Sequence, residues 1–329
     1  MKIAIIGAGI AGLAAADELS RAGHDIVLHD KGRGAGGRMS TRRAQTPSGK
    51  CRWDHGAQYF TVRSEAFRTR LKPLMDAGAI AQWSPRLVIA ETAEGRWTFA
   101  ERSLEDEMFV GTPSMNALIK AMAETHKVHW SSRVMAIETD GAVKTLVLEG
   151  GGRDGPFDAV VCAIPAEQAA SLLEPVSPRL ASEASGVRSA PCWAAMLAFE
   201  GDVGVDWDGA SVGQGPLAWV ARDGSKPGRG NAETWVLHAT PEWATANLDL
   251  APQEAADLLA RAFIELTGAP SPVYSAAHRW LLAKVESGVG EAFGWDANAC
   301  IGAVGDWRIA PRVEAAWQSG HSLGEFLSR

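Results

Sequence analysis

The distribution of apolar and polar residues over the first 30 positions predicts a strand, a helix and a second strand. Lys2–Ile6 is a short apolar run rich in β-branched residues, which is typical of a buried parallel strand. Apolar residues at helical spacing follow over Ala11–Arg21, and Asp25–His29 has the pattern of a second strand. This order predicts that the chain begins as an α/β fold.

Further along, the pattern predicts a mixture of helices and strands. A helix is predicted at Ser64–Ala77, and another opens at Thr112-Pro113 with proline in its first turn. Strand patterns occur at 143–148, 157–164, 194–199, 217–221, 234–238, 273–282 and 300–304, and helical patterns occur at 242–248, 253–266 and from Pro311 onward. With 329 residues, about two domains are expected.

Glycines between the first strand and the first helix indicate a dinucleotide site. Gly7, Gly9 and Gly12 have G-x-G-x-x-G spacing, which provides a tight turn, close approach of a pyrophosphate and close helix packing. The N-terminus of the helix predicted from Ala11 would present free N–H groups to the phosphates. Asp30 ends the second strand, where a carboxylate can accept hydrogen bonds from ribose hydroxyls.

A second glycine-rich turn decides which dinucleotide is expected. Gly34, Gly36, Gly37 and Arg38 follow Asp30 and suit the far side of a pyrophosphate. Here the chain resembles the flavin amine oxidase superfamily, in which an acid-ended second strand leads into a GGR segment. The resemblance implies FAD, and no cysteine has a recognisable flavin-linking context, so non-covalent binding is expected.

The segment Cys51–Thr61, CRWDHGAQYFT, resembles the D-x-G-A-Q-Y-F-T phrase of the renalases and their bacterial relatives. The resemblance implies that His55, Gly56 and Ala57 pass beside the isoalloxazine ring and that Gln58 hydrogen-bonds the flavin edge or the substrate. From the residues alone, a half-buried strand with a polar end remains the alternative reading.

The C-terminal part resembles the superfamily's second flavin motif, a Gly-Asp pair followed by a helix with small residues. It implies that Asp306 bonds the ribityl or pyrophosphate region and that N–H groups near Arg312 and Val313 face the flavin ring. Val134 matches a valine whose backbone pairs with adenine. The full set of implied FAD contacts is Gly7, Gly9, Ile10, Ala11, Gly12, Asp30, Lys31, Gly37, Arg38, His55, Gly56, Ala57, Gln58, Val134, Gly305, Asp306, Arg312 and Val313.

The resemblance also implies the architecture: a Rossmann-like FAD-binding domain of the glutathione-reductase type and a discontinuous α+β substrate domain on an antiparallel sheet. The expected FAD-binding ranges are 1–64, 111–165 and 297–329. The expected substrate-domain ranges are 65–110 and 166–296.

Candidate substrate-pocket residues come from renalase-like phrases in the second domain, WVARDGSKP, TWVLHAT and AHRW. The residues predicted to line the pocket are Gln58, Tyr59, Trp219, Arg222, His238, His278 and Trp280. For either histidine, a structural role is an equal alternative. The polar segment Arg222–Arg229 is expected to be a solvated hairpin tip, with a substrate phosphate grip led by Arg222 as the alternative.

Composition narrows the class further. The net charge of −7 argues against general affinity for nucleic acid or anionic membranes. Four cysteines without metal-ligand spacing predict no metal site and a reduced, cytoplasmic protein. No run of 18 apolar residues occurs, so no transmembrane span is expected.

Three functions remain open. The resemblance favours a renalase-like oxidase that takes a hydride from dihydropyridine isomers of NAD(P)H and passes the electrons to O2, forming hydrogen peroxide. A true amine oxidase is the second reading, but the lysine candidate, Lys284, lies just past the strand that would supply it, and the chain has only two tyrosines. A flavoprotein with structural or sensory FAD is the third.

Overall fold

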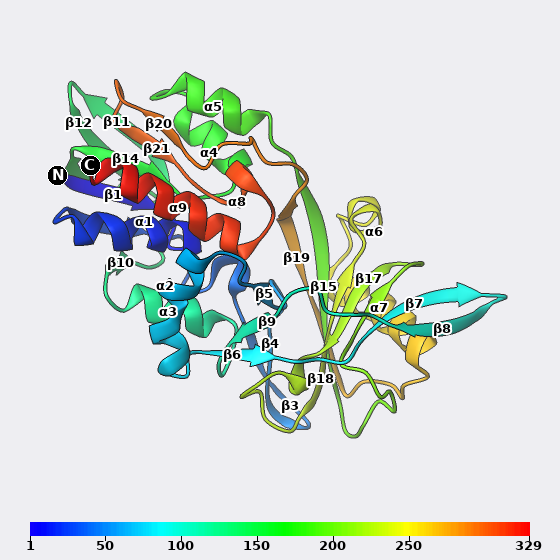
Figure 1. The fold of residues 1–329 in the computed structure, drawn as a ribbon. Coiled ribbons are helices and arrows are strands. Elements are labelled where there is room, and N and C mark those ends of the chain that lie inside the picture. The colour runs from blue at the N-terminus through cyan, green and yellow to red at the C-terminus, as the bar shows by residue number, and fades with distance from the viewer. The chain divides into compact units, whose positions relative to one another are not determined.

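The computed structural model describes all residues from Met1 to Arg329. Its contacts divide the chain into two compact units (Figure 1). Unit 1 comprises Met1–Gly37, Ile119–Ser189 and Val285–Arg329, and unit 2 comprises Arg38–Leu118 and Ala190–Lys284. The chain therefore passes between the units four times.

Unit 1 is built on a six-stranded sheet in the order β10-β2-β1-β14-β21-β20. All neighbouring pairs are parallel except β20 with β21. The strands are β1 (Lys2–Ile6), β2 (Asp25–His29), β10 (Lys127–His129), β14 (Ala159–Cys162), β20 (Gly294–Asp296) and β21 (Ile301–Ala303). The four residues of β14 are fully buried, as expected for a parallel strand covered on both faces.

Helices and a small antiparallel sheet complete unit 1. The helices are α1 (Ile10–Arg21), α4 (Ala166–Leu173), α5 (Pro178–Ser185), α8 (Asp306–Ile309) and α9 (Val313–Leu327), and the small sheet comprises β11 (Val134–Asp140), β12 (Val143–Leu148) and β13 (Arg153–Phe157). α1 and α9 lie side by side (Figure 1), and a Cβ on Gly320 would lie 1.9 Å from the carbonyl oxygen of Ala11. Only glycine permits this approach of the two helices.

Unit 2 is built on a seven-stranded sheet in the order β19-β15-β18-β17-β16-β7-β8. Its strands are β7 (Leu87–Ala93), β8 (Arg96–Glu101), β15 (Ser189–Phe199), β16 (Gly209–Val212), β17 (Leu217–Arg222), β18 (Glu233–Ala239) and β19 (Tyr274–Val285). β15 begins at one unit boundary, and β19 ends at another. One face packs on α7 (Pro252–Thr267) through residues such as Trp235, Leu237 and Phe263.

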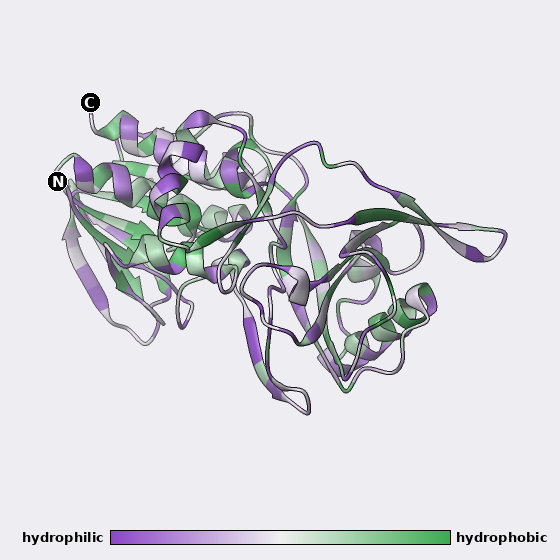
Figure 2. Cartoon of the chain, turned by 60° about the horizontal axis from the view of Figure 1, so that its bottom comes forward, coloured by the Kyte–Doolittle hydropathy of each residue, from purple (hydrophilic) through white to green (hydrophobic).

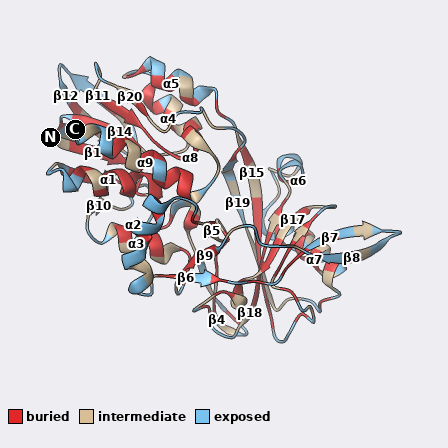
Figure 3. Cartoon of the chain, viewed as in Figure 1, coloured by how far each residue is buried: buried red, intermediate tan, exposed pale blue.

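The remaining elements of unit 2 are short. They are η1 (Gly37–Met39), β3 (Arg42–Thr46), β4 (Gly49–Trp53), β5 (Phe60–Thr61), α2 (Glu65–Asp76), β6 (Ile80–Trp83), β9 (Met108–Gly111), η2 (Asp223–Ser225) and α6 (Pro241–Ala246), while α3 (Asn116–Ala123) crosses a boundary. Figure 3 shows buried residues in red along the central strands of each unit, and in Figure 2 green apolar stretches occur among the strands near the N-terminus.

The α/β class, the Rossmann-like sheet and the largely antiparallel second sheet are confirmed. One detail of the second sheet differs, because β16 and β7 are parallel. The predicted helix start at Pro113 is wrong: α3 begins at Asn116 because the N–H of Met115 donates to the Asp54 carboxylate at 2.9 Å.

Contacts draw the boundaries differently from the predicted domains. Residues 38–64 belong to unit 2, because β4 contributes Cys51 and Trp53 to a core with β15 and β18. Residues 166–189 belong to unit 1, because α4 and α5, which were not predicted, bury Leu172, Leu173 and Leu180 in its core. Which ranges bind cofactor and which bind substrate remains a prediction.

Candidate functional site

Each of the three glycines of the G-x-G-x-x-G motif in unit 1 has its own structural role. Gly7 has a φ of +105°, in the region that favours glycine. A Cβ on Gly12 would lie 2.0 Å from the carbonyl oxygen of Gly7, so any side chain there would separate helix and turn. Gly9 precedes α1 with extended backbone, and a Cβ there would meet no protein atom within 4 Å. Its open side is the cradle that a pyrophosphate would fill.

The Asp30 carboxylate organises the same turn. Its Oδ2 accepts the Ala8 N–H at 2.8 Å, and its Oδ1 accepts the Gly32 N–H at 2.6 Å. An ionised carboxylate can accept about four hydrogen bonds, so capacity for ribose hydroxyls remains. Lys31 donates to Gln168 at 3.4 Å, and burial lowers the pKa of Lys31.

The second half of the implied cofactor site in unit 1 lies where β21 meets α8 and α9. Gly305 has a φ of +152°, and its N–H donates to Ser319 Oγ at 3.0 Å. Asp306 is buried at the start of α8, while Arg312 caps α9 and Val313 begins it. α9 has 15 residues, so its N-terminus carries the positive end of a helix dipole. Val134 is the first residue of β11.

In unit 2, four of the predicted pocket residues share one face of the large sheet. Trp219 on β17 pairs directly with His238 on β18, which places both side chains on the same face. On β19, His278 and Trp280 are two residues apart and also share a face. Their neighbour Ala276 packs on the Trp53 cluster, on the face opposite α7.

His55 connects these strands to the loop after β4. Its carbonyl oxygen accepts the Trp280 Nε1–H at 2.9 Å and contacts His238 Nε2 at 3.3 Å. Its ring lies 5.1 Å from His278, which meets Trp280 edge-on at 4.5 Å. Gly56 is required beside it, because a Cβ would lie 2.0 Å from the Arg38 carbonyl oxygen, and the Ala57 N–H donates to the same oxygen at 2.9 Å.

The imidazoles of this face are neutral at ordinary pH. Burial lowers the pKa of His55 to about 4, with the charge of His278 acting in the same direction. Burial also lowers the pKa of His238 to about 4, and the ammonium of Lys226 adds to that effect. The pKa of His278 is lowered by burial and by the guanidinium of Arg42. The face therefore presents uncharged rings beside a permanent positive charge.

Tyr59 belongs to the same region. Its ring lies 6.0 Å from Trp219 and 6.3 Å from Trp83. Trp83 was not among the predicted residues, although it stands in a strand-like run. The residues that structure brings together on this face are thus indoles, a phenol and neutral imidazoles.

The prediction that Arg222–Arg229 is a solvated hairpin tip is wrong. Lys226 and Arg229 have 2% and 8% of their surface exposed. Lys226 Nζ donates to Asp223 Oδ1 at 2.6 Å, and Arg229 Nε donates to Asp54 Oδ2 at 3.1 Å. These four residues form a buried ion cluster of two acids and two bases, and the acids compensate the positive charge that made the segment resemble a solvated turn.

The cluster also shifts its own acids. Burial opposes ionisation of Asp54, but Lys226 and Arg229 nevertheless hold the pKa of Asp54 below its usual value. Burial raises the pKa of Asp223, and the nearby charge of Asp54 raises it further. Asp54 and Lys226 each lie in a recognisable sequence motif. No local pattern, however, indicates that the two residues form a pair.

Two predicted pocket residues have other partners. Arg222 lies three residues after Trp219 on β17, so its side chain is on the opposite face of the sheet, which packs on α7. There its guanidinium stacks over Trp235 at 5.2 Å and donates to the Val205 carbonyl at 2.8 Å. The structure does not bring Arg222 to the histidine face. Gln58 has 6% of its surface exposed, and its amide is bonded within unit 2 to the Asp54 carbonyl and to Lys226.

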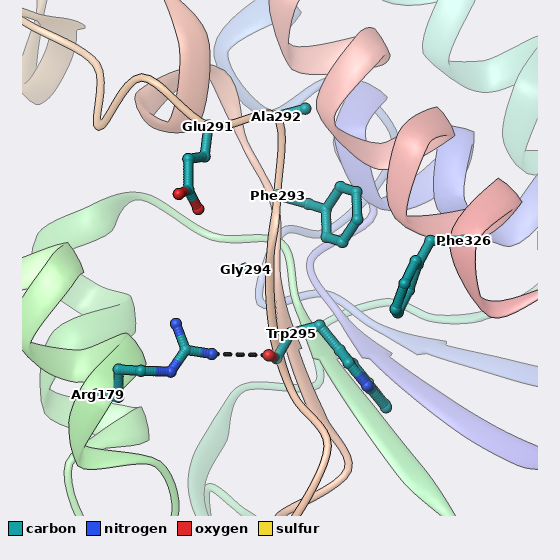
Figure 4. Close-up of a pocket in the computed structure, with 7 residues that line it drawn as sticks. All are labelled: Arg179, Glu291, Ala292, Phe293, Gly294, Trp295 and Phe326. Atoms are coloured by element: carbon teal, nitrogen blue, oxygen red, sulfur yellow. Dashed lines mark hydrogen bonds between the residues drawn. The ribbon is translucent and has the colours of Figure 1, made fainter.

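Two other features of unit 1 contain no predicted site residue. His29, His129 and Asp154 place their ligand atoms within 4.8 Å of one another, but His29 already uses both nitrogens, on Ser132 and Asp154 at 2.9 Å each. A shallow surface pocket (Figure 4) is lined by Arg179, Glu291, Ala292, Phe293, Gly294, Trp295 and Phe326. It contains no predicted site residue, and Arg179 donates to the Trp295 carbonyl.

The glycine turn before α1 and the helix start after Gly305, both in unit 1, are features that a dinucleotide cofactor would use. The family model for flavin containing amine oxidoreductases matches residues 81–294, and that for an NAD(P)-binding Rossmann-like domain matches residues 5–75. The protein therefore belongs to the flavin containing amine oxidoreductase family, and its cofactor is FAD.

Solved structures share the fold at low sequence identity. A putative protoporphyrinogen oxidase from Exiguobacterium sp. 255-15 has a TM-score of 0.77 at 11% identity, with 99% of this chain and 98% of that chain covered. Cyclohexylamine oxidase from Brevibacterium oxydans IH-35A has a TM-score of 0.76 at 15% identity, covering 100% and 99%.

Among curated proteins, 4,4'-diapophytoene desaturases of Staphylococcus aureus are 50% identical over 40 residues, which is 12% of this chain. The chain spans only 8% of the length of these relatives. None of the helices has both the length and the apolar content that crossing a bilayer requires.

Proposed function

We propose that the protein is a renalase-like oxidase of dihydropyridine isomers of NAD(P)H. The substrate ring would lose a hydride and become an aromatic pyridinium. Bound FAD supplies the hydride acceptor, and O2 takes the electrons onward as hydrogen peroxide. We infer that unit 1 holds the dinucleotide part of the cofactor.

The observation that carries this proposal is the uncharged sheet face of Trp219, His238, His278 and Trp280 beside Arg42. Flat neutral rings suit stacking and orientation of a dihydropyridine, which needs no strong base because aromaticity drives hydride loss. Burial is the main cause of the lowered pKa values of His55 and His278, and the guanidinium of Arg42 adds to it; this positive charge would repel a protonated amine. The same charge would attract the phosphates of a dinucleotide.

The lysines also favour this reading. Lys226 is buried and ion-paired with Asp223, which stabilises the protonated ammonium, whereas only the neutral amine could act as a base. Lys284 is exposed near the end of β19.

A second candidate function, amine oxidation, is supported by the family and by the structural similarity to cyclohexylamine oxidase.

The deciding experiment is anaerobic rapid mixing of the FAD-loaded protein with 2- or 6-dihydro NAD isomers and, separately, with benzylamine and cyclohexylamine. We expect the isomers to bleach the flavin band much faster than either amine. Trp280→Leu should slow bleaching by about tenfold to a hundredfold if the indole holds the substrate ring. Lys284→Met is the matched control and should leave the rate unchanged. Faster bleaching by amines, or a collapse of the rate in the lysine variant, would establish amine oxidation instead.

A further inference from the structure

We propose that Lys226 and Asp223 are positioning residues that fix the Asp54–Gln58 strip through the side chain of Gln58. This inference rests on the proposed function only for the effect on substrate oxidation. The placement of the strip itself follows from contacts within unit 2.

The side-chain amide of Gln58 is engaged by partners within unit 2. Its amide nitrogen donates to the Asp54 carbonyl and lies 3.4 Å from the Gly56 carbonyl. Its Oε1 accepts the Lys226 ammonium at 3.3 Å. The amide therefore ties the end of the strip back to its beginning, and Lys226 dictates which way the amide faces, because only an oxygen can accept from an ammonium.

Lys226 is in turn held from three sides. Its Nζ donates to Asp223 Oδ1 at 2.6 Å and lies 3.6 Å from Asp54 Oδ2. Its side chain is fully buried, and the ammonium lies 5.6 Å from the centre of the Trp83 ring. Asp223 Oδ2 meanwhile accepts the backbone N–H of Asp54 at 3.4 Å. Asp223 thus touches both the lysine and the start of the strip.

The other end of the cluster anchors Asp54. Its Oδ1 accepts Thr41 Oγ1 at 2.7 Å and the Met115 N–H at 2.9 Å, while Oδ2 accepts the guanidinium of Arg229. Arg229 also donates to the Gly111 carbonyl at 2.7 Å. With Asp54 fixed by Arg229 and Gln58 fixed by Lys226, the residues between them have little freedom.

Those intervening residues are the ones for which the resemblance to the renalases implies contact with a flavin ring. The His55 carbonyl receives Trp280 and His238, and the Ala57 N–H is bonded to Arg38. Loss of the lysine would free the Gln58 amide to turn and would let the strip shift against Trp280. The expected consequence is a poorly placed ring environment rather than loss of a reacting group.

The test uses the double variant Asp223→Asn/Lys226→Met, because Lys226→Met alone would leave Asp223 buried without a cation. The double variant removes one charge of each sign, and Asp54 keeps Arg229. The FAD-loaded protein is examined by hydrogen exchange of the 54–59 amides, by the visible spectrum of the bound flavin, and by anaerobic bleaching over a range of dihydropyridine concentrations.

We expect FAD to remain stoichiometric, the 54–59 amides to exchange at least about tenfold faster, and the flavin band to shift. The limiting bleaching rate should fall at least about tenfold while the concentration dependence changes little, as for a misplaced near-attack geometry. Lys284→Met should behave as wild type in all three measurements.

A triple variant that adds Gln58→Leu separates positioning from a direct role. If Lys226 acts through Gln58, the triple variant is no slower than the double variant. If Gln58→Leu slowed bleaching further by a factor independent of the double substitution, the proposal would be overturned. Unchanged amide exchange together with an unchanged flavin spectrum in the double variant would also overturn it. If the wild type fails to oxidise any dihydropyridine, the proposed function fails, whereas exchange and spectrum still decide the positioning roles.

Discussion

The two polar centres of the molecule, the glycine fingerprint of unit 1 and the ion cluster of unit 2, are built in opposite ways. The fingerprint uses backbone groups and one acid, all within the first 32 residues, and the Asp30 contacts to Ala8 and Gly32 are local. The ion cluster uses four charged side chains, and its Asp54–Asp223 contact spans 169 residues. A backbone site can therefore be recognised from a short pattern, whereas a side-chain network exists only once the whole unit has folded.

The largest expected effect is at the backbone site. Gly9→Val should abolish FAD binding while the apoprotein folds, because a Cβ at Gly9 meets no protein atom and its backbone is extended. Gly12→Ala should instead destabilise the fold, because its Cβ would clash with the Gly7 carbonyl. Flavin stoichiometry and circular dichroism distinguish the two. A Gly9→Val protein that retained stoichiometric FAD would contradict the cradle assignment.

The ion cluster should give the next largest effect. Asp54→Ala leaves Lys226 and Arg229 with a single buried acid, so a loss of about 3–5 kcal/mol in unfolding free energy is expected. Urea unfolding measures it. Asp54→Ala/Arg229→Met, which removes a charge of each sign, should recover part of the loss. A loss below about 1 kcal/mol in the single variant would show that the cluster is not closed to water.

A smaller effect is expected at the acid of the fingerprint. Asp30→Ala should weaken FAD binding by about 1–3 kcal/mol, since charge-assisted hydrogen bonds to the turn and the ribose are lost. Titration of the apoprotein with FAD measures the change. The exposed Asp76, paired only with Lys72, provides the matched control, and Asp76→Ala should leave FAD affinity unchanged. Equal affinity in the Asp30 variant would remove the ribose role.

The remaining effect concerns the pH dependence of stability. The pKa values of His55 and His238 are about 4 in the folded protein, below the usual 6.5, so the unfolded chain binds more protons between these values. Stability is therefore complete above about pH 6.5 and falls as pH drops toward 4, by up to about 1.4 kcal/mol per pH unit for each histidine. Urea unfolding at pH 7 and pH 5 should show this slope, and His238→Gln should flatten it. A slope unchanged by the substitution would assign it to other groups.

Much of the fold could be predicted because its signals are local. β1, α1 and β2 follow from apolar periodicity and glycine spacing, and the strands that carry Trp219, His238 and Trp280 follow from alternation. Alternation also explains the failure at Arg222, since the register that places Trp219 on one face necessarily places Arg222 on the other.

What could not be predicted depended on long-range partners. Lys226 and Arg229 have the composition of a surface turn, and only the burial of Asp54 and Asp223 beside them makes them interior residues. α4 and α5 were missed for a similar reason: their small apolar faces are explained only by the unit 1 core on which they pack.

The close contact between Gly320 and Ala11 has a consequence for how the protein is made. The first helix is synthesised roughly 300 residues before the helix that packs on it. At about 5–20 residues per second, the nascent chain would wait roughly 15–60 seconds with that surface uncovered. Packing of unit 1 therefore cannot be completed before α9 has been synthesised, and a chain truncated before α9 is expected to require chaperones to remain unaggregated.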